Sequence, residues 1–187
     1  MTKKDLTHQL ENQLWKHTKK RGTFGCFEVT IGWRGKERVD YLTYDTKEVF
    51  RCYEVKVSKT DFYSKNKLSF LGNYNYYVMP LDLYKEVKED IEDFVGVYLS
   101  KGEKLVSVKR AKKQELKVEK DLLKDSMIRS LYRESEKVIS NRDPLEIEKI
   151  RKELKKAKKK SYQNYRRNMD LRKKLYQKYG ESWKEDL

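Results

Sequence analysis

The chain has 187 residues, enough for one domain of ordinary size and an appendage, and 40% of them are charged. Its net charge of +15 is unevenly placed, because residues 1–108 carry 19 basic and 16 acidic side chains whereas residues 109–187 carry 26 and 14. No apolar run reaches the roughly 18 residues of a membrane span, and the polar N-terminus lacks the hydrophobic segment of a signal peptide. We therefore expect a cytoplasmic protein that makes no membrane contact and binds a polyanion, most often nucleic acid.

Hydrophobic periodicity predicts a mixed α/β domain in the first part of the chain. Leu6, Leu10 and Leu14 recur at helical spacing, whereas the stretch TFGCFEVTIGW alternates as a strand does. The elements predicted in chain order are a helix over residues 5–20, strands over 23–33, 37–45 and 48–58, a short helix over 59–69, a strand over 74–80, a helix over 81–90, and a hairpin over 96–100 and 104–112. This order, αβββαβαββ, predicts one α/β domain over residues 1–113.

Beyond residue 113 the pattern is helical and strongly basic. Apolar residues recur at helical spacing over 114–140, and Asp143-Pro144-Leu145-Glu146 then combines a capping residue, a first-turn proline and an acid at the start of a second helix. One face of that helix is apolar as far as Tyr179 and the other is mostly Lys and Arg. We expect residues 114–187 to form a basic helical extension, either an αα-hairpin or a coiled-coil arm. Its apolar face is compatible with a homodimer formed through these helices.

The predicted central strands contain Asp40, Glu54 and Lys56, and burying such a charge is costly unless it is paired or bound to a metal. If the short turn pairs Asp45 with Val49, Asp40 lies opposite Glu54; a turn one residue tighter leaves the two acids out of register by one position. Lys56 shares a strand face with Glu54, because side chains two residues apart point the same way. The first register therefore gathers Asp40, Glu54 and Lys56 into one cluster.

Such a cluster has the groups that phosphodiester cleavage requires. The reaction needs a polarised phosphate, an oriented water and a stabilised leaving oxygen. Mg²⁺ or Mn²⁺ takes one or two protein carboxylates and keeps several waters, which suits Asp40 and Glu54, with the Val55 carbonyl as a third oxygen. Lys56 would orient the attacking water and neutralise phosphate charge. The alternative is a structural salt-bridge cluster that binds no metal.

An acid, a hairpin and then Glu-x-Lys on the next strand resembles the PD-(D/E)XK nuclease superfamily; here the pattern reads Asp40 and Glu54-Val55-Lys56. The stretches EVKVSKTDF, NYYVMP and LVSVKRAK are similar to the MmcB-like DNA-repair nucleases of bacteria and phages, over residues 5–113. Val39 departs from the proline that often precedes the aspartate. The resemblance implies a restriction-endonuclease-like core, Asp40, Glu54 and Lys56 as catalytic residues, and a bacterial cell or phage-infected host as the setting.

The resemblance implies further site residues as well. Other members complete the metal site with a glutamate of the first helix, for which Glu11 is the candidate and Glu28 the second; the alternative for Glu11 is a solvated helix residue. Ser58, Lys59 and Lys67 follow the motif and would contact phosphate, although Ser58 could equally cap a helix and Lys67 could be an ordinary surface lysine.

Together these observations predict a metal-dependent nuclease that hydrolyses DNA phosphodiester bonds in repair, recombination or replication, with Mg²⁺ or Mn²⁺ as cofactor. The alternative is a non-catalytic, nuclease-like protein that binds nucleic acid, or inhibits a nucleic-acid complex, through its basic arm. In both cases phosphate contacts are expected from the most crowded lysines of the long helix, Lys152, Lys155, Lys156 and Lys159.

Overall fold

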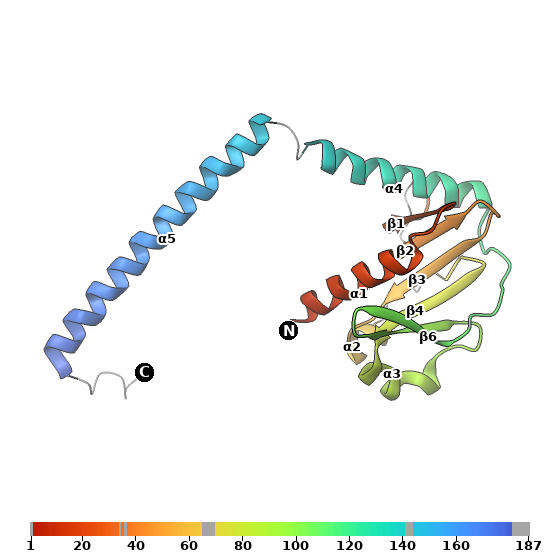
Figure 1. Ribbon diagram of the computed structural model, residues 1–187, viewed down its shortest axis with the longest axis horizontal. Coiled ribbons are helices and arrows are strands. Elements are labelled where there is room, and N and C mark those ends of the chain that lie inside the picture. The colour runs from red at the N-terminus through yellow and green to blue at the C-terminus, as the bar shows by residue number, and fades with distance from the viewer. Residues whose placement is uncertain (1, 34, 36, 65–69, 141–143, 181–187) are drawn as a thin grey trace. The chain divides into compact units, whose positions relative to one another are not determined.

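The computed structural model describes residues 2–33, 35, 37–64, 70–140 and 144–180. The chain divides into two compact units, Met1–Glu134 and Ser135–Leu187. The first unit contains a β-sheet and the helices that cover it, and the described part of the second is helical (Figure 1). No helix within the described ranges is both long enough and apolar enough to span a membrane.

The first unit has the predicted element order, αβββαβαββ, followed by the start of a further helix. The elements are α1 (Lys3–Thr18), β1 (Thr23–Thr30), β2 (Arg38–Asp45), β3 (Phe50–Val55), α2 (Lys59–Phe62), β4 (Tyr74–Pro80), α3 (Leu81–Val87) with the 3-10 turn η1 (Lys88–Asp90), β5 (Gly96–Lys101), β6 (Lys104–Lys109) and α4 (Lys120–Ser140). The mixed α/β class is confirmed. The helix predicted over 59–69 is the single turn α2, and residues 65–69 lie outside the described part of the chain.

The six strands form one sheet in sequence order, β1-β2-β3-β4-β5-β6. The β1–β2, β2–β3 and β5–β6 pairs are antiparallel, whereas β3–β4 and β4–β5 are parallel. The two parallel pairs require crossover connections, which α2 and α3 provide.

The β2–β3 hairpin adopts the first of the two predicted registers. The Asp45 N–H donates to the Val49 carbonyl at 3.2 Å, and the pairs that follow along both strands keep that register. Asp40 therefore lies opposite Glu54, as the turn length predicted.

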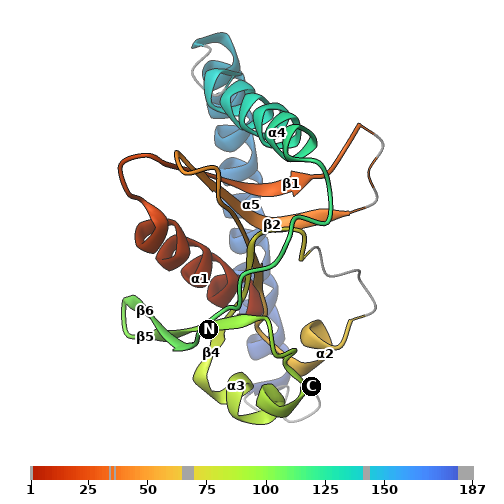
Figure 2. The same cartoon turned by 90° about the vertical axis from the view of Figure 1, so that its right-hand side faces the viewer.

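Helices cover both faces of the sheet (Figure 2). On one face, α1 buries Leu10 and Leu14 completely against side chains of β2, β3 and β4. A capping box between Thr2 and Asp5 fixes the start of α1. On the opposite face, α3 packs in a cluster with β4 and β5, and α4 packs in another with β1, β2 and β3.

Helix α4 carries the compact unit past residue 113, where the sequence analysis placed the domain boundary. Leu123 is fully buried and Met127 is 4% exposed, both in the cluster with β1–β3. Ser126 Oγ accepts a hydrogen bond from the Gly32 N–H at 3.0 Å. The apolar positions at the start of the predicted extension therefore belong to the core of the first unit, which continues to Glu134.

The second unit consists of the end of α4 and the helix α5 (Pro144–Tyr179). Apart from half-buried Ile147, all its described side chains on α5 are exposed, including Tyr162, Tyr165 and Tyr176. The predicted helical extension is thus present, and its arrangement as a hairpin or a coiled coil remains a prediction.

Candidate active site

Three adjacent strands each place an acidic residue at the same level of the sheet. The β1–β2 register puts Glu28 opposite Asp40, and the β2–β3 register puts Glu54 opposite Asp40 on its other side. Glu28 has a φ of +51°, a left-handed conformation that is uncommon outside glycine, and its carboxylate lies 3.7 Å from the Arg38 guanidinium. At 3.7 Å between two exposed side chains this contact is loose, and Asp40 and Glu54 are the two acids that interact closely.

The Asp40 carboxylate is held against β3 by the protein backbone. Its Oδ2 accepts a hydrogen bond from the Val55 N–H at 3.0 Å. The backbone pairing of β2 with β3 ends at Tyr41 and Tyr53, so the Val55 N–H has no strand partner on β2 and is free to bind this side chain. The bond fixes the position of the carboxylate, and burial nevertheless raises the pKa of Asp40 above its usual range.

Glu54 is 4% exposed, and its Oε1 is buried without a hydrogen-bond partner. Burial, followed by the negative charge of Asp40, raises the pKa of Glu54 to about 8. The two carboxyl groups lie within hydrogen-bonding reach of each other when Glu54 is protonated. Such a pair resists double ionisation unless a positive charge lies beside it.

Lys56 supplies one such charge, although not at close range. The residue is 5% exposed, and its Nζ lies 3.9 Å from Glu54 Oε2 and 3.8 Å from Asp61 Oδ1. Asp61 belongs to α2, and its Oδ2 accepts a hydrogen bond from the Val57 N–H at 3.1 Å. Both separations from Lys56 are long for a direct ion pair. Asp40, Glu54 and Lys56 therefore lie close together, but the charge of Lys56 neutralises the carboxylates only weakly.

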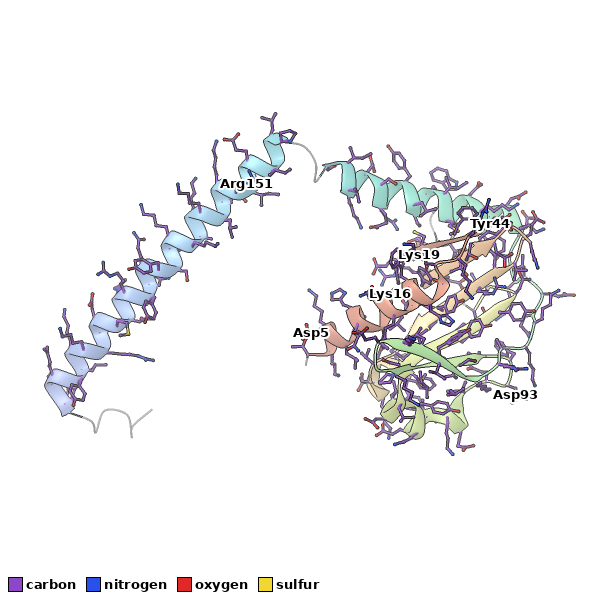
Figure 3. All side chains as sticks on the ribbon, in the orientation of Figure 1. Asp5, Lys16, Lys19, Tyr44, Asp93 and Arg151 are labelled. Atoms are coloured by element: carbon purple, nitrogen blue, oxygen red, sulfur yellow. The ribbon has the colours of Figure 1, made fainter. Side chains whose placement is uncertain are left out.

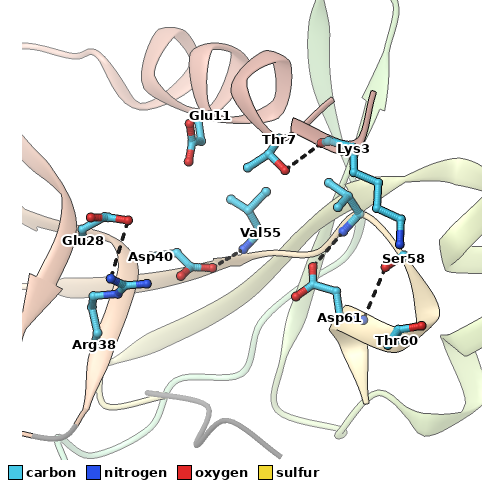
Figure 4. A pocket seen from close by; sticks show the side chains of 11 residues that line it. Lys3, Thr7, Glu11, Glu28, Arg38, Asp40, Val55, Ser58, Thr60 and Asp61 are labelled. Carbon is cyan, nitrogen blue, oxygen red and sulfur yellow. Dashed lines mark hydrogen bonds and ion pairs between the residues drawn. The ribbon is translucent and has the colours of Figure 1, made fainter. Parts of the chain in front are cut away.

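A cavity of about 500 Å³ opens beside this cluster (Figure 4). Asp40 and Val55 line it, whereas Glu54 and Lys56 are buried next to it. Both predicted additional acids lie on its wall: Glu11 reaches it from α1 and Glu28 from β1. Glu11 is also 3.1 Å from His8 Nδ1, so its carboxylate already has a partner.

Asp40 and Glu54 together fit a hard divalent cation that needs only two protein carboxylates. Among the described residues, no group of three or more His, Cys, Asp or Glu is arranged to hold a metal. Mg²⁺ needs fewer, because it takes one or two protein carboxylates and fills its other positions with water. Two adjacent carboxyl groups, one with an unpartnered oxygen, meet that requirement. The structure shows the Val55 N–H bound to the Asp40 carboxylate, whereas ligation of a metal by the Val55 carbonyl remains a prediction.

The residues predicted to contact phosphate are spread along the chain. Ser58 lines the cavity and caps α2, because its Oγ accepts from the Asp61 N–H at 3.4 Å. Lys59 is exposed, 3.4 Å from Glu86, and Lys67 lies outside the described residues. The remaining four, Lys152, Lys155, Lys156 and Lys159, are exposed on α5, where Lys152 is bound to Glu148 at 2.8 Å.

Asp61, whose Oδ1 lies 3.8 Å from Lys56 Nζ, was given no role of its own by sequence reasoning. It stands in the KTDF stretch directly after the Glu-x-Lys motif, so its proximity along the chain was visible. Its contact with Lys56 depends on α2 turning back over the end of β3, which the residue spacing did not specify.

Comparison with known proteins supports the fold and gives no function. No family model matches the chain, and no curated protein matches it. Among solved structures, the chain is similar to the SPO1766 protein of unknown function from Silicibacter pomeroyi, with a TM-score of 0.59 and 17% sequence identity. The match covers 74% of this chain and 92% of that one. At this identity the similarity concerns the fold alone.

Proposed function

We propose that the chain is a metal-dependent nuclease that hydrolyses DNA phosphodiester bonds on a restriction-endonuclease-like PD-(D/E)XK core. One observation carries the proposal: the half-buried carboxyl of Asp40 adjoins the buried carboxyl of Glu54, which has a pKa of about 8 and an unpartnered oxygen. Perturbed acids beside a cavity are typical of functional sites. The proposed setting is DNA repair, recombination or replication in a bacterium or a phage-infected host.

Each residue of the cluster has a part in this proposal. The Asp40 and Glu54 carboxylates would hold Mg²⁺ or Mn²⁺, which polarises a phosphate and stabilises a leaving oxygen. The hydrogen bond from the Val55 N–H keeps Asp40 in place without a change of conformation. Lys56, whose Nζ lies 3.9 Å from Glu54 Oε2, would orient the attacking water and neutralise phosphate charge.

A second function, nucleic-acid binding without catalysis, is favoured by the burial of the cluster. Glu54 and Lys56 are 4% and 5% exposed, as two members of a structural salt-bridge cluster would also be. The exposed, basic helix α5 would then be the binding element of such a protein.

Cleavage assays on the full chain separate the two functions. Supercoiled plasmid, linear duplex, single-stranded DNA and RNA are each incubated with Mg²⁺, Mn²⁺, Ca²⁺ or EDTA. The nuclease proposal predicts cleavage of at least one DNA substrate with Mg²⁺ or Mn²⁺, and none with Ca²⁺ or EDTA. Glu54→Gln and Lys56→Met, which keep the size of each side chain, should abolish cleavage.

The matched control is Glu89→Gln, because the Glu89 side chain is 85% exposed and lies outside the cavity. It should cleave as the wild type does. Full activity in Glu54→Gln would exclude this site, whereas nucleic-acid binding without cleavage of any substrate would favour the second function.

A further inference from the structure

A second cavity, of about 250 Å³, lies at the other end of α1 from the candidate active site. The first cavity is lined by residues at the start of α1, such as Lys3 and Thr7, and the second by His17 and Thr18 at its end. Strands β1 to β5 all contribute to the second cavity. It is smaller than the roughly 300–1,000 Å³ of pockets that hold drug-sized ligands, so its size suits a ligand with one or two rings.

Three tyrosines form a continuous wall of this cavity. The rings of Tyr53 and Tyr76 are stacked, with centroids 5.1 Å apart and an interplanar angle of 15°, and Tyr98 lies 5.1 Å from Tyr76. Burial raises the pKa of all three, and that of Tyr76 to about 12, so each hydroxyl stays protonated at neutral pH. Each hydroxyl can therefore donate a hydrogen bond to a ligand and accept one from it.

Thr43 adds a fourth hydroxyl, and this one is buried without a well-formed hydrogen bond. The residue is 1% exposed and its Oγ1 has no partner that satisfies hydrogen-bond geometry, although the Tyr53 hydroxyl lies within reach. Buried hydroxyls are nearly always hydrogen-bonded, because an unsatisfied one costs the free energy of its lost hydration. Thr43 lines the cavity but its Oγ1 is closed to solvent, so a ligand gains this hydroxyl only when side chains of the wall shift.

The charges around the cavity favour an anionic group at its mouth. Arg51 is bound to Asp45 at 2.7 Å, so these two largely neutralise each other inside. Lys20 also lines the cavity and is exposed, and three further exposed cations adjoin it along the chain. They are Lys16, Lys19 and Arg21, of which Lys16 and Lys19 are labelled in Figure 3.

We propose that this cavity binds one nucleotide unit, with the base and sugar among the hydroxyls and the phosphate at Lys20. The tyrosine and threonine hydroxyls both donate and accept, which matches a heterocycle that carries donors and acceptors on its edge. Lys20, an exposed cation on the cavity wall, matches a phosphate. The nucleotide is either free or one unit of a strand. The proposal does not depend on cleavage at Asp40 and Glu54, because the second cavity contains neither residue.

Isothermal titration of the full chain in EDTA, with each of the four 5′-mononucleotides, tests the proposal. At least one mononucleotide should bind, and more tightly than its nucleoside or inorganic phosphate alone. Thr43→Val and Tyr76→Phe each remove one hydroxyl and should weaken binding about tenfold, the equivalent of one good hydrogen bond. Lys20→Gln should weaken binding of the mononucleotide and leave that of the nucleoside unchanged.

Three controls guard against indirect effects. Tyr132→Phe removes a hydroxyl from a side chain that is 65% exposed on α4, outside the cavity, and should bind as the wild type does. Thermal unfolding should show Thr43→Val to be as stable as the wild type or more so, since its hydroxyl is poorly satisfied in the fold. Asp40→Asn should keep full mononucleotide binding, which separates this cavity from the candidate active site.

Dinucleotides distinguish the two sources of the nucleotide. If a dinucleotide binds as tightly as the mononucleotide, the cavity accepts one unit of a strand. If the mononucleotide binds selectively, the ligand is a free nucleotide. The proposal is overturned if no mononucleotide binds at millimolar concentration. It is equally overturned if Thr43→Val and Tyr76→Phe both bind as the wild type does, or if Asp40→Asn abolishes binding.

Discussion

The buried carboxyl of Glu54 should make the folded protein less stable as the pH rises from about 4.5 to about 8. The pKa of Glu54 is about 8 in the fold, against 4.5 for an unperturbed glutamate, because the residue is buried beside the charge of Asp40. Between these two values the unfolded chain has lost the proton that the folded chain still holds. The free energy of unfolding therefore falls through this window and levels off above it.

The size of the effect follows from the two pKa values. At 1.36 kcal/mol for each pKa unit, the shift corresponds to on the order of 5 kcal/mol, a large fraction of the 5–15 kcal/mol that stabilises a typical domain. Glu54→Gln keeps the shape of the side chain and removes its titration. The variant should match the wild type near pH 4.5 and exceed its stability by several kcal/mol at pH 9.

Urea unfolding of both proteins at pH 5, 7 and 9 in EDTA measures this difference. Titrating groups remote from Glu54 contribute equally to the two proteins, so they cancel in the comparison. Glu89→Gln, at an exposed position, should differ little from the wild type at any pH. A stability difference between Glu54→Gln and the wild type that stays constant from pH 5 to pH 9 would refute the reasoning.

Three further predictions concern the hydrogen bond to Asp40, the packing of α4 and the role of α5. Asp40→Ala should lower the free energy of unfolding by about 1–3 kcal/mol more than Asp40→Asn, because only asparagine keeps an acceptor for the Val55 N–H; equal urea midpoints would argue against that bond. Leu123→Ala should cost about 2–5 kcal/mol, since the side chain is fully buried, whereas Leu154→Ala on α5, 53% exposed, should cost little. Equal losses would contradict the assignment of α4 to the core. Deletion of residues 144–187 should leave the melting temperature of the first unit unchanged, weaken nucleic-acid binding and flatten its salt dependence, by close to one unit of log–log slope for each phosphate that α5 neutralises. Identical slopes would rule out α5 as a binding element.

The order of the elements along the chain, and two possible registers for the β2–β3 hairpin, could be predicted from the sequence because few arrangements satisfy the pattern. Alternating side chains define the strands, and a short turn allows only two pairings between β2 and β3. One of them places Asp40 opposite Glu54, and that one is found. The predicted gathering of Asp40, Glu54 and Lys56 followed from this local geometry alone.

Other features depend on contacts that residue spacing does not specify. Apolar residues at helical spacing look the same whether a helix packs on its own sheet or on a partner, so Leu123 and Met127 were assigned to an extension. The left-handed backbone conformation of Glu28 and the contact of its side chain with Arg38 also cannot be read from residue spacing. The Lys56–Asp61 contact likewise requires the path of the chain after β3.

Two neighbouring tyrosines of β4 illustrate one feature that the sequence pattern predicts and one that it does not. Alternation along NYNYY places the neighbouring Tyr76 and Tyr77 on opposite faces of the sheet. Tyr77 is indeed 1% exposed in the core on the α3 side. Tyr76 instead lines the second cavity with residues from other strands, which no local pattern could have brought together.

Binding of Mn²⁺ to the wild-type chain, followed by isothermal titration from pH 6 to pH 9, tests most directly whether Asp40 and Glu54 form a cation site. The account predicts one site whose affinity rises with pH, because the cation must displace the proton that Glu54 holds up to about pH 8. That site should be lost in Asp40→Asn and in Glu54→Gln, and kept when residues 144–187 are deleted. Absence of Mn²⁺ binding at every pH, or binding that both substitutions leave unchanged, would contradict the account.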